Sequence, residues 1–436
     1  MRIVVWPKNL ELGGSQESAV TLAEGLTRLG EDVVVAAPSG PLEHRLRLGP
    51  TRTVRMRSGR SRTGRVAART RLIRSERPDV VVAFEYPGIL EAAAASVLAG
   101  RRTPVAGVIH ATRVPWFLPE STSLAVARDE LRRFTVQWWP GTVHLVPPPI
   151  PAPPQGEAIG RAPTVDGAHL LVVSRLVESF KAEGIVRSIE AMRHLARTGA
   201  VLTIAGDGPA RDRFELVADR VNADVGRSVV RFAGAVTDPT AAIRSADVVL
   251  GSGMSIIHGL ALERPCLVVG RDGFAEAVDA ASLDGLRDAG FYGAGGPVLT
   301  PEALAHRVID VLDAHHAAAA SELRERVLAE YGSHAVAAGF RSQLRSAAGG
   351  AAPTAGELVR AGARRWHYRW RRAGFRRRVP TDRITPEQID DHVFGRLRDM
   401  PVAGRRLTGR RAAPARVDVG DGTSADRPAP VSTVLP

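Results

Sequence analysis

Two cations stand where a strand of this 436-residue chain should end. The apolar run 170–173 has the length and β-branched content of a buried strand, and it leads through Arg175 to a polar turn that holds Lys181. In open α/β sheets ligands bind at the carboxyl ends of the strands, and an arginine fork together with a lysine is a common means of holding a diphosphate. The alternative is a surface network of ion pairs with Glu178 and Glu183.

Two further candidates lie in the amino-terminal half. Gly13 and Gly14 follow an expected strand over 2–6 and precede an amphipathic helix, an arrangement in which glycines let backbone N–H groups approach a phosphate or a sugar. A plain tight turn is the alternative. His110 closes the expected strand 104–109, where a ligand would lie, although a histidine that merely caps a strand fits the pattern as well.

Two sets of parallel strands would present these side chains. Short apolar runs alternate with helical patterns, which favours α/β architecture with mostly parallel sheets. The expected strands are 2–6, 32–37, 79–84 and 104–109 in the first half, and 170–176, 200–205, 229–236, 247–251 and 265–270 in the second. We therefore predict two Rossmann-like, doubly wound domains with one cleft between them.

The expected boundaries follow from composition. Residues 146–163 are too rich in proline for a helix or a central strand, so the first domain covers 1–150 and an extended linker covers 151–163. The second domain covers 164–348, and a basic, partly disordered tail covers 349–436. Residues 45–77 are rich in arginine and poor in acids, which predicts a basic face beside the first domain.

Composition excludes several classes of protein. A hydrophobic fraction of 44% is typical of a globular chain, while the net charge of +13 is strongly basic. Cys266 is the only cysteine, which excludes a disulfide framework and predicts a buried thiol in a reducing compartment. No segment reads as a signal peptide or a membrane span. The expected location is the cytoplasm, with peripheral attachment to the inner face of the cell membrane as a further hypothesis.

The order of landmarks in the second half resembles a known family. The landmarks are Ser174-Arg175-Leu176 with Lys181, Ile204-Ala205-Gly206-Asp207-Gly208-Pro209, Val230-Arg231-Phe232-Ala233-Gly234, Ala246-Asp247-Val248-Val249 and Arg264-Pro265. Together they look like glycosyltransferase family 4, the retaining nucleotide-sugar transferases of the GT-B fold. The likeness covers about 168–279 and extends more faintly through Gly13, Gly14 and His110.

The resemblance implies an activity and roles for three residues. In that family the residues matching Arg175 and Lys181 hold the donor diphosphate, and the histidine matching His110 contacts the transferred sugar near the reacting carbon. Such cations would stabilise a departing nucleoside diphosphate without a metal, so neither a metal nor a cofactor is expected. The second domain would bind the donor and the first domain the acceptor.

One stretch departs from the family. The family carries two glutamates eight positions apart, but here His258 stands at the place of the second, and the loop for the first is too short. An imidazole can still donate a hydrogen bond to a ribose hydroxyl, with a neutral core histidine as the alternative. Gly253 to Ser255 can bind phosphate at a helix amino terminus. Glu276 is a candidate for a sugar hydroxyl, with a helix-start carboxylate as the alternative.

The tail contains a basic aromatic segment. Residues 358–378 hold a dense arginine cluster and four aromatic residues, including Trp366 and Trp370, and no acid. A basic helix with interfacial aromatics suits an anionic membrane surface. Non-specific binding to nucleic acid and a solvated charged segment are the alternatives, and we do not expect nucleic acid as the partner.

The residues and the resemblance lead to one hypothesis. The protein would be a glycosyltransferase that moves a sugar from a nucleoside-diphosphate sugar to a cell-envelope acceptor, either a lipid-linked saccharide or a polysaccharide, with retention and without metal. The alternative is a GT-B-like protein that binds a sugar nucleotide without turnover, because the glutamate pair is missing.

Overall fold

The computed structural model describes residues 1–56, 61–111, 113–151, 164–178, 181–236, 238–293 and 298–378. The predicted linker beyond residue 151 and the tail beyond residue 378 lie outside the described residues. The chain divides into two compact units, Met1–Arg365, which holds both sheets, and Trp366–Pro436. The predicted domain boundaries at 150, 164 and 348 remain predictions.

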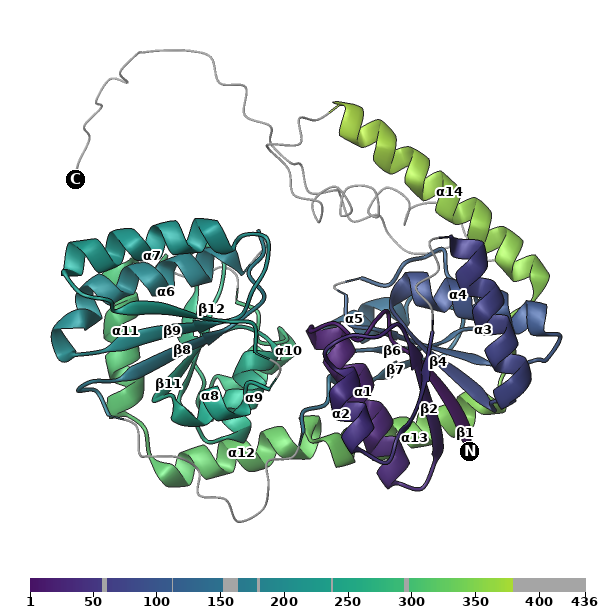
Figure 1. Ribbon diagram of the computed structural model, residues 1–436, viewed down its shortest axis with the longest axis horizontal. Coiled ribbons are helices and arrows are strands. Elements are labelled where there is room, and N and C mark those ends of the chain that lie inside the picture. The colour runs from purple at the N-terminus through teal and green to yellow at the C-terminus, as the bar shows by residue number, and fades with distance from the viewer. Residues whose placement is uncertain are drawn as a thin grey trace, which may run out of the picture. The chain divides into compact units, whose positions relative to one another are not determined.

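The first sheet has seven parallel strands in the order β3-β2-β1-β4-β5-β6-β7 (Figure 1). Its strands are β1 (Arg2–Trp6), β2 (Asp32–Ala37), β3 (Arg52–Arg55), β4 (Val80–Phe84), β5 (Val105–Ile109), β6 (Ser123–Val126) and β7 (Val143–Leu145). The helices that connect them are α1 (Gly14–Arg28), α2 (Glu43–Leu48), α3 (Arg62–Glu76), α4 (Glu85–Ala99) and α5 (Asp129–Thr135). The strand order reverses between β1 and β4, and in Rossmann-like folds ligands bind at such a point.

The second sheet has six strands in the order β10-β9-β8-β11-β12-β13, and only β13 is antiparallel to its neighbour. Its strands are β8 (His169–Val173), β9 (Val201–Ala205), β10 (Val230–Gly234), β11 (Val248–Gly251), β12 (Cys266–Val269) and β13 (Ala275–Ala277). Its helices are α6 (Ala182–Leu195), followed by the 3₁₀ turn η1 (Ala196–Thr198), α7 (Arg211–Val225), α8 (Thr240–Ser245), α9 (Met254–Ala261), α10 (Leu283–Asp288), α11 (Pro301–Asp313) and α12 (Ala317–Tyr331). Two parallel-dominated α/β sheets were predicted, and the structure confirms them.

Alternation along the buried strands builds a core on each face of the second sheet. Leu170 and Val172 face the core that α6, α7 and α11 cover, whereas Leu171 faces the core that α9, α10 and α12 cover. Both faces are therefore apolar, which explains why these strands read as continuous hydrophobic runs.

Helix α13 (Ser333–Ala348) belongs to the core of the first sheet, although the predicted boundary at 348 groups it with the second. Val336, Phe340 and Leu344 are buried in one cluster with strand residues such as Ile3. The Arg341 guanidinium donates to the Leu29 carbonyl at 3.2 Å. An amphipathic pattern shows that a helix has a buried face but not which core receives it.

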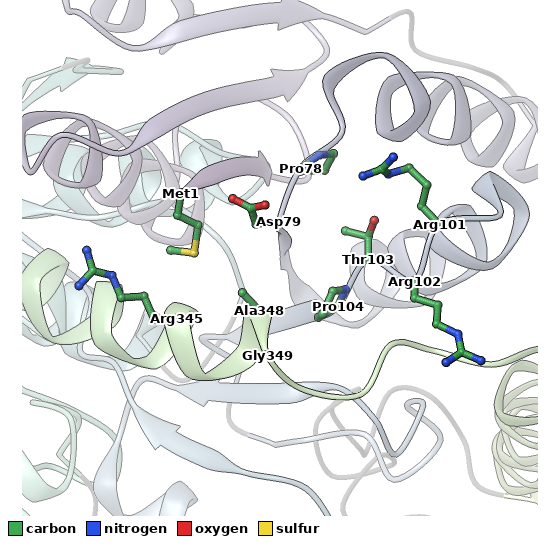
Figure 2. A pocket seen from close by; sticks show the side chains of 10 residues that line it. All are labelled: Met1, Pro78, Asp79, Arg101, Arg102, Thr103, Pro104, Arg345, Ala348 and Gly349. Carbon is green, nitrogen blue, oxygen red and sulfur yellow. The ribbon is translucent and has the colours of Figure 1, made fainter.

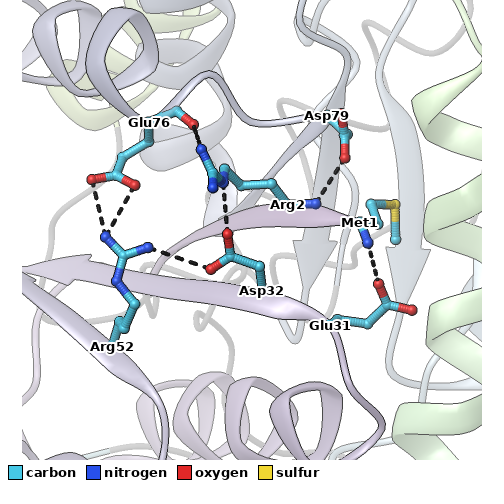
Figure 3. A network of polar contacts seen from close by, with 7 residues as sticks. All are labelled: Met1, Arg2, Glu31, Asp32, Arg52, Glu76 and Asp79. Atoms are coloured by element: carbon cyan, nitrogen blue, oxygen red, sulfur yellow. Dashed lines mark hydrogen bonds and ion pairs between the residues drawn. The ribbon is translucent and has the colours of Figure 1, made fainter.

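Ion pairs cross the amino-terminal edge of the first sheet (Figure 3). Arg2 donates to Asp32 at 2.6 Å, and Arg52 pairs with both Asp32 and Glu76 at 3.3 Å. The hydrogen bond from Arg2 lowers the pKa of Asp32. Arg45 similarly pairs with Glu24 at 2.7 Å. The expected basic face over 45–77 is thus partly neutralised by acids from other elements.

Candidate functional site

Arg175 follows β8 and is positioned by the turn after β9. The Leu176 N–H donates to the Asp207 carbonyl at 3.0 Å, and Leu176 is fully buried. A Cβ on Gly206 would lie 1.8 Å from the Ser174 carbonyl oxygen, so only glycine allows this close approach. The two packed backbone segments therefore hold Arg175 at the carboxyl edge of the sheet.

The two glutamates near Arg175 and Lys181 form ion pairs with other arginines. Glu178 forms a short ion pair with Arg213, and Glu183 pairs with Arg187 at 2.5 Å. Arg175 is exposed, and its guanidinium has no hydrogen-bond or ion-pair partner among the described residues. The alternative to a diphosphate site was a surface network in which Glu178 and Glu183 pair with Arg175 and Lys181. In the structure both glutamates pair with other arginines.

Lys181 is the N-cap residue of α6 and is partly buried. Burial lowers the pKa of its ammonium group. The Nζ atom lies 5.7 Å from the centre of the Tyr292 ring. Tyr292 was not singled out from the sequence, because an aromatic residue in a loop carries no pattern that marks it.

The start of α9 differs from the expected phosphate site in one respect. The Gly253 N–H donates to the Phe291 carbonyl at 2.9 Å, so this N–H is not available to a ligand. Ser255 is buried, and its hydroxyl donates to the Ser252 carbonyl at 3.3 Å. His258 lies one turn further on, where burial lowers its pKa to about 4, so the imidazole is neutral at pH 7. The proposed roles of Ser255 and His258 remain predictions.

Glu276 lies in the edge strand β13, opposite Val268 of β12, and its side chain is exposed. The helix-start alternative is therefore wrong. The Phe274 N–H donates to the Arg271 carbonyl at 3.0 Å, and this turn reverses the chain into an antiparallel strand. A sugar hydroxyl as the partner of Glu276 remains a prediction.

In the first domain, the Glu85 carboxylate links the segment that follows Gly14 to His110. Gly13 is the N-cap of α1 and Gly14 its first residue, so the glycine pair leads directly into the helix. Glu85 accepts a hydrogen bond from the Ser15 hydroxyl at 3.4 Å and from the His110 N–H at 3.1 Å. The carboxyl ends of β1, β4 and β5 thus meet at one point.

His110 presents a neutral ring at this point. Both of its ring nitrogens are buried and have no hydrogen-bond partner among the described residues. Burial lowers its pKa to about 4, so at pH 7 the ring offers one donor and one acceptor to a ligand. The ring packs edge-on against Phe84, with 5.8 Å between the two ring centres.

Glu85 is a residue that sequence reasoning missed. Its φ of 59° lies in the left-handed region, which is uncommon for a residue with a side chain, and burial raises its pKa. Both features cost stability, and such costs concentrate at functional sites. The rule that selected His110, a polar residue directly after a buried strand, would also have selected Glu85.

A cavity of about 680 Å³ lies away from all these residues (Figure 2). Its lining includes Arg101, Arg102, Arg345 and Asp79. The three guanidinium groups point in different directions rather than toward one ligand position. The cavity is at the amino-terminal edge of the first sheet, the opposite edge from His110.

Comparison with known families matches both halves of the chain. The family described as Glycosyltransferase Family 4 matches residues 12–150, and the one described as Glycosyl transferases group 1 matches residues 167–314. The chain therefore belongs to the family 4-like glycosyltransferases of the GT-B fold. No curated protein matches the chain by sequence.

Solved structures share the fold at low sequence identity. A glycosyltransferase from Rickettsia africae has a TM-score of 0.59 and 14% identity, covering 79% of this chain and 98% of that chain. Anabaena Alr3699/HepE in complex with UDP and glucose has a TM-score of 0.58 and 14% identity, covering 79% and 100%. A mutant of S. aureus TarM in complex with fondaparinux, alpha-GlcNAc-glycerol and UDP has a TM-score of 0.54 and 10% identity, covering 80% and 99%.

Proposed function

We propose that this glycosyltransferase moves a sugar from a nucleoside-diphosphate sugar to a cell-envelope acceptor, with retention and without a metal. The observation that carries the proposal is the placement of Arg175. The Gly206 turn fixes its backbone at the carboxyl edge of the second sheet, and its guanidinium has no partner among the described residues. Lys181 is the N-cap residue of α6, the helix that follows the same strand.

The chemistry explains why such cations suit the reaction. When the bond to the donor sugar breaks, negative charge develops on the departing nucleoside diphosphate, and fixed cations stabilise that charge in the transition state. Metal independence is proposed because Arg175 and Lys181 can supply this charge. The neutral ring of His110 can bind a hydroxyl of the transferred sugar. Retention of configuration is inferred from the family resemblance.

Replacing Arg175 by alanine tests the donor site. We expect a loss of about 2 kcal/mol in transition-state stabilisation, or roughly 30-fold in kcat/KM, with an unchanged melting temperature. The control is Arg213→Ala, an exposed arginine of the same domain that pairs with Glu178. Unchanged kcat/KM in the Arg175→Ala protein would remove the central assignment.

A panel of UDP- and GDP-sugars identifies the donor. Uridine nucleotides come first, because the Anabaena and S. aureus proteins of this fold were solved with UDP. A nucleotide that binds only the folded protein raises its melting temperature, so thermal shifts rank the panel. Transfer or hydrolysis of the bound donor supports the proposal, whereas binding without turnover favours the non-catalytic alternative.

The acceptor is proposed to be lipid-linked because of α14 (Ala355–Arg378). Val359, Trp366 and Trp370 are spaced by seven and four residues, so they share one helix face, and they are 73%, 68% and 60% exposed. Ala361 and Tyr368 lie on the opposite face and are buried. Exposed Arg369 and Arg371 flank the aromatic face, which suits an anionic membrane surface. No helix among the described residues is long and apolar enough to cross a membrane.

Substitution of the two tryptophans is a sharper test than deletion of the tail. The first turn of α14 supports the first domain, since Glu357 accepts from the Ser121 N–H at 2.8 Å, and a deletion would remove this contact. We expect Trp366→Ser with Trp370→Ser to weaken binding to anionic vesicles roughly tenfold while UDP affinity is kept. The control is Leu216→Ser, an exposed apolar residue on α7.

Three results would reject the membrane role. The first is equal binding of the tryptophan variant and the unaltered protein to anionic vesicles. The second is equal binding of the unaltered protein to anionic and neutral vesicles. The third is tight binding to duplex DNA that competes with the vesicles, which would favour nucleic acid as the partner of the basic segment.

A further inference from the structure

Tyr292 lies beside two parts of the expected donor site. The Lys181 Nζ atom is 5.7 Å from the centre of its ring, within the range in which an ammonium group is attracted to an aromatic face. Its hydroxyl lies against the start of α9, where a Cβ on Gly253 would be 2.7 Å from the phenol oxygen. The tyrosine side chain therefore lies against Gly253, which precedes α9, and beside Lys181, the N-cap residue of α6.

The backbone around Tyr292 is held on both sides. The carbonyl of Phe291, the residue before it, accepts from the Gly253 N–H at 2.9 Å. The carbonyl of Gly293, the residue after it, accepts from the Arg271 N–H at 3.2 Å. These two bonds tie the tyrosine to the segments that follow β11 and β12. The backbone on either side of Tyr292 is thus fixed to segments that continue the sheet strands.

An aromatic neighbour suits Lys181 because this lysine is partly buried. Burial disfavours the charged form of an ammonium group, and the negative face of an aromatic ring offsets part of that cost. Lysine also has a long side chain with many rotamers, so a ring against its ammonium restricts where the charge can lie. Glu183 cannot serve in the same way, since it binds Arg187 and the N–H groups of residues 272 and 273.

We propose that Tyr292 is a positioning residue of the donor site, whose ring face holds the Lys181 ammonium where the diphosphate of a nucleotide sugar binds. This inference rests on the proposed function, because it takes Lys181 as a ligand of the diphosphate. It adds a residue to the donor site that acts through Lys181.

Nucleotide titrations of paired variants test the inference. UDP and GDP are titrated into the unaltered protein, and the tighter ligand is used for the variants. We expect Tyr292→Leu to weaken binding about 5- to 10-fold and Tyr292→Phe to change it less than about 2-fold, because phenylalanine keeps the ring face. In a Lys181→Met background, which has no ammonium group, Tyr292→Leu should have little further effect.

A variant of unchanged shape removes the risk that Tyr292→Leu fails to fold. Trifluorophenylalanine at position 292 has nearly the shape of phenylalanine but a much weaker negative face, and we expect it to bind the nucleotide about 3-fold more weakly than Tyr292→Phe. Equal affinity of these two proteins would overturn the inference. An undiminished effect of Tyr292→Leu in the Lys181→Met background would also overturn it.

The same titrations separate the two hypotheses. If Lys181→Met weakens nucleotide binding and Tyr292→Leu does not, only the role of Tyr292 fails. If Lys181→Met leaves nucleotide affinity unchanged, or if the unaltered protein binds neither nucleotide, the proposed donor site fails and the role of Tyr292 fails with it.

Discussion

Replacing Gly206 by alanine should separate the segment that carries Arg175 from the turn that holds it. The new Cβ would lie 1.8 Å from the Ser174 carbonyl oxygen and 2.9 Å from the Ser174 carbonyl carbon. Both atoms belong to the backbone, so no change of rotamer can relieve the contact. The two segments must therefore move apart.

The expected cost follows from what that movement breaks. Overpacking of a well-packed site typically costs about 1–3 kcal/mol. Separation also stretches the hydrogen bond from Ser174 N–H to the Ala205 carbonyl, at 3.1 Å, and the one from Leu176 N–H to the Asp207 carbonyl, at 3.0 Å, each with a net worth of about 1 kcal/mol. We expect the free energy of unfolding to fall by about 3 kcal/mol. Arg175 would be displaced in the molecules that still fold, so nucleotide affinity should fall as well.

Urea unfolding and nucleotide titration measure the two effects. The control is Gly285→Ala, because this glycine lies inside α10 with nothing within 4 Å of an added Cβ, so its substitution should be neutral or stabilise by up to about 1 kcal/mol. A Gly206→Ala protein that keeps its nucleotide affinity and lies within about 0.5 kcal/mol of the unaltered stability would refute the reasoning.

Three further predictions concern titratable groups. If the imidazole of His258 binds the ribose, His258→Glu should keep or improve nucleotide affinity, and His258→Leu should weaken it by roughly 1–3 kcal/mol. Equal affinities of all three proteins in isothermal titration would reject that role. Burial raises the pKa of Glu85, so the folded state loses stability as pH rises through that pKa. Glu85→Gln should therefore stabilise the protein more at pH 7 than at pH 4, and parallel pH profiles of the melting temperature would contradict this. The hydrogen bond from Arg2 lowers the pKa of Asp32, so the stabilisation by this ion pair is present above the unfolded pKa of Asp32 and is lost as pH falls. Because the pair is exposed, Asp32→Asn should lower the free energy of unfolding by less than about 1 kcal/mol at pH 7, as measured by urea unfolding.

The central strands were predictable from sequence. The expected strands 2–6 and 32–37 coincide with β1 and β2, and 200–205 differs from β9 by one residue. Strands β1 and β2 are buried on both faces beyond their first residue, so each one appears there as an unbroken apolar run. The short strands β3, β6, β7 and β13 were not predicted. Strands β3, β7 and β13 lie at sheet edges, where solvent tolerates polar residues and pairing with a neighbour defines the strand, and β6 has only four residues.

The candidate site was only partly predictable. Sequence placement after a strand selected His110 and Arg175, because the carboxyl ends of parallel strands gather at one edge of a sheet. The same rule could have selected Glu85, but its left-handed φ and its bond to the His110 N–H are visible only in the fold. Tyr292 carried no signal, since its contact with Lys181 joins residues more than one hundred positions apart.

The sequence by itself determined the α/β class, the parallel sheets and the family, because burial periodicity and motif spacing are local properties of the chain. Only the tertiary structure decided which groups meet. It placed α13 against the first sheet and gave Glu178 and Glu183 the partners Arg213 and Arg187. Such contacts depend on the packing of distant elements, and a local pattern of residue types holds no information about which distant element will supply the partner.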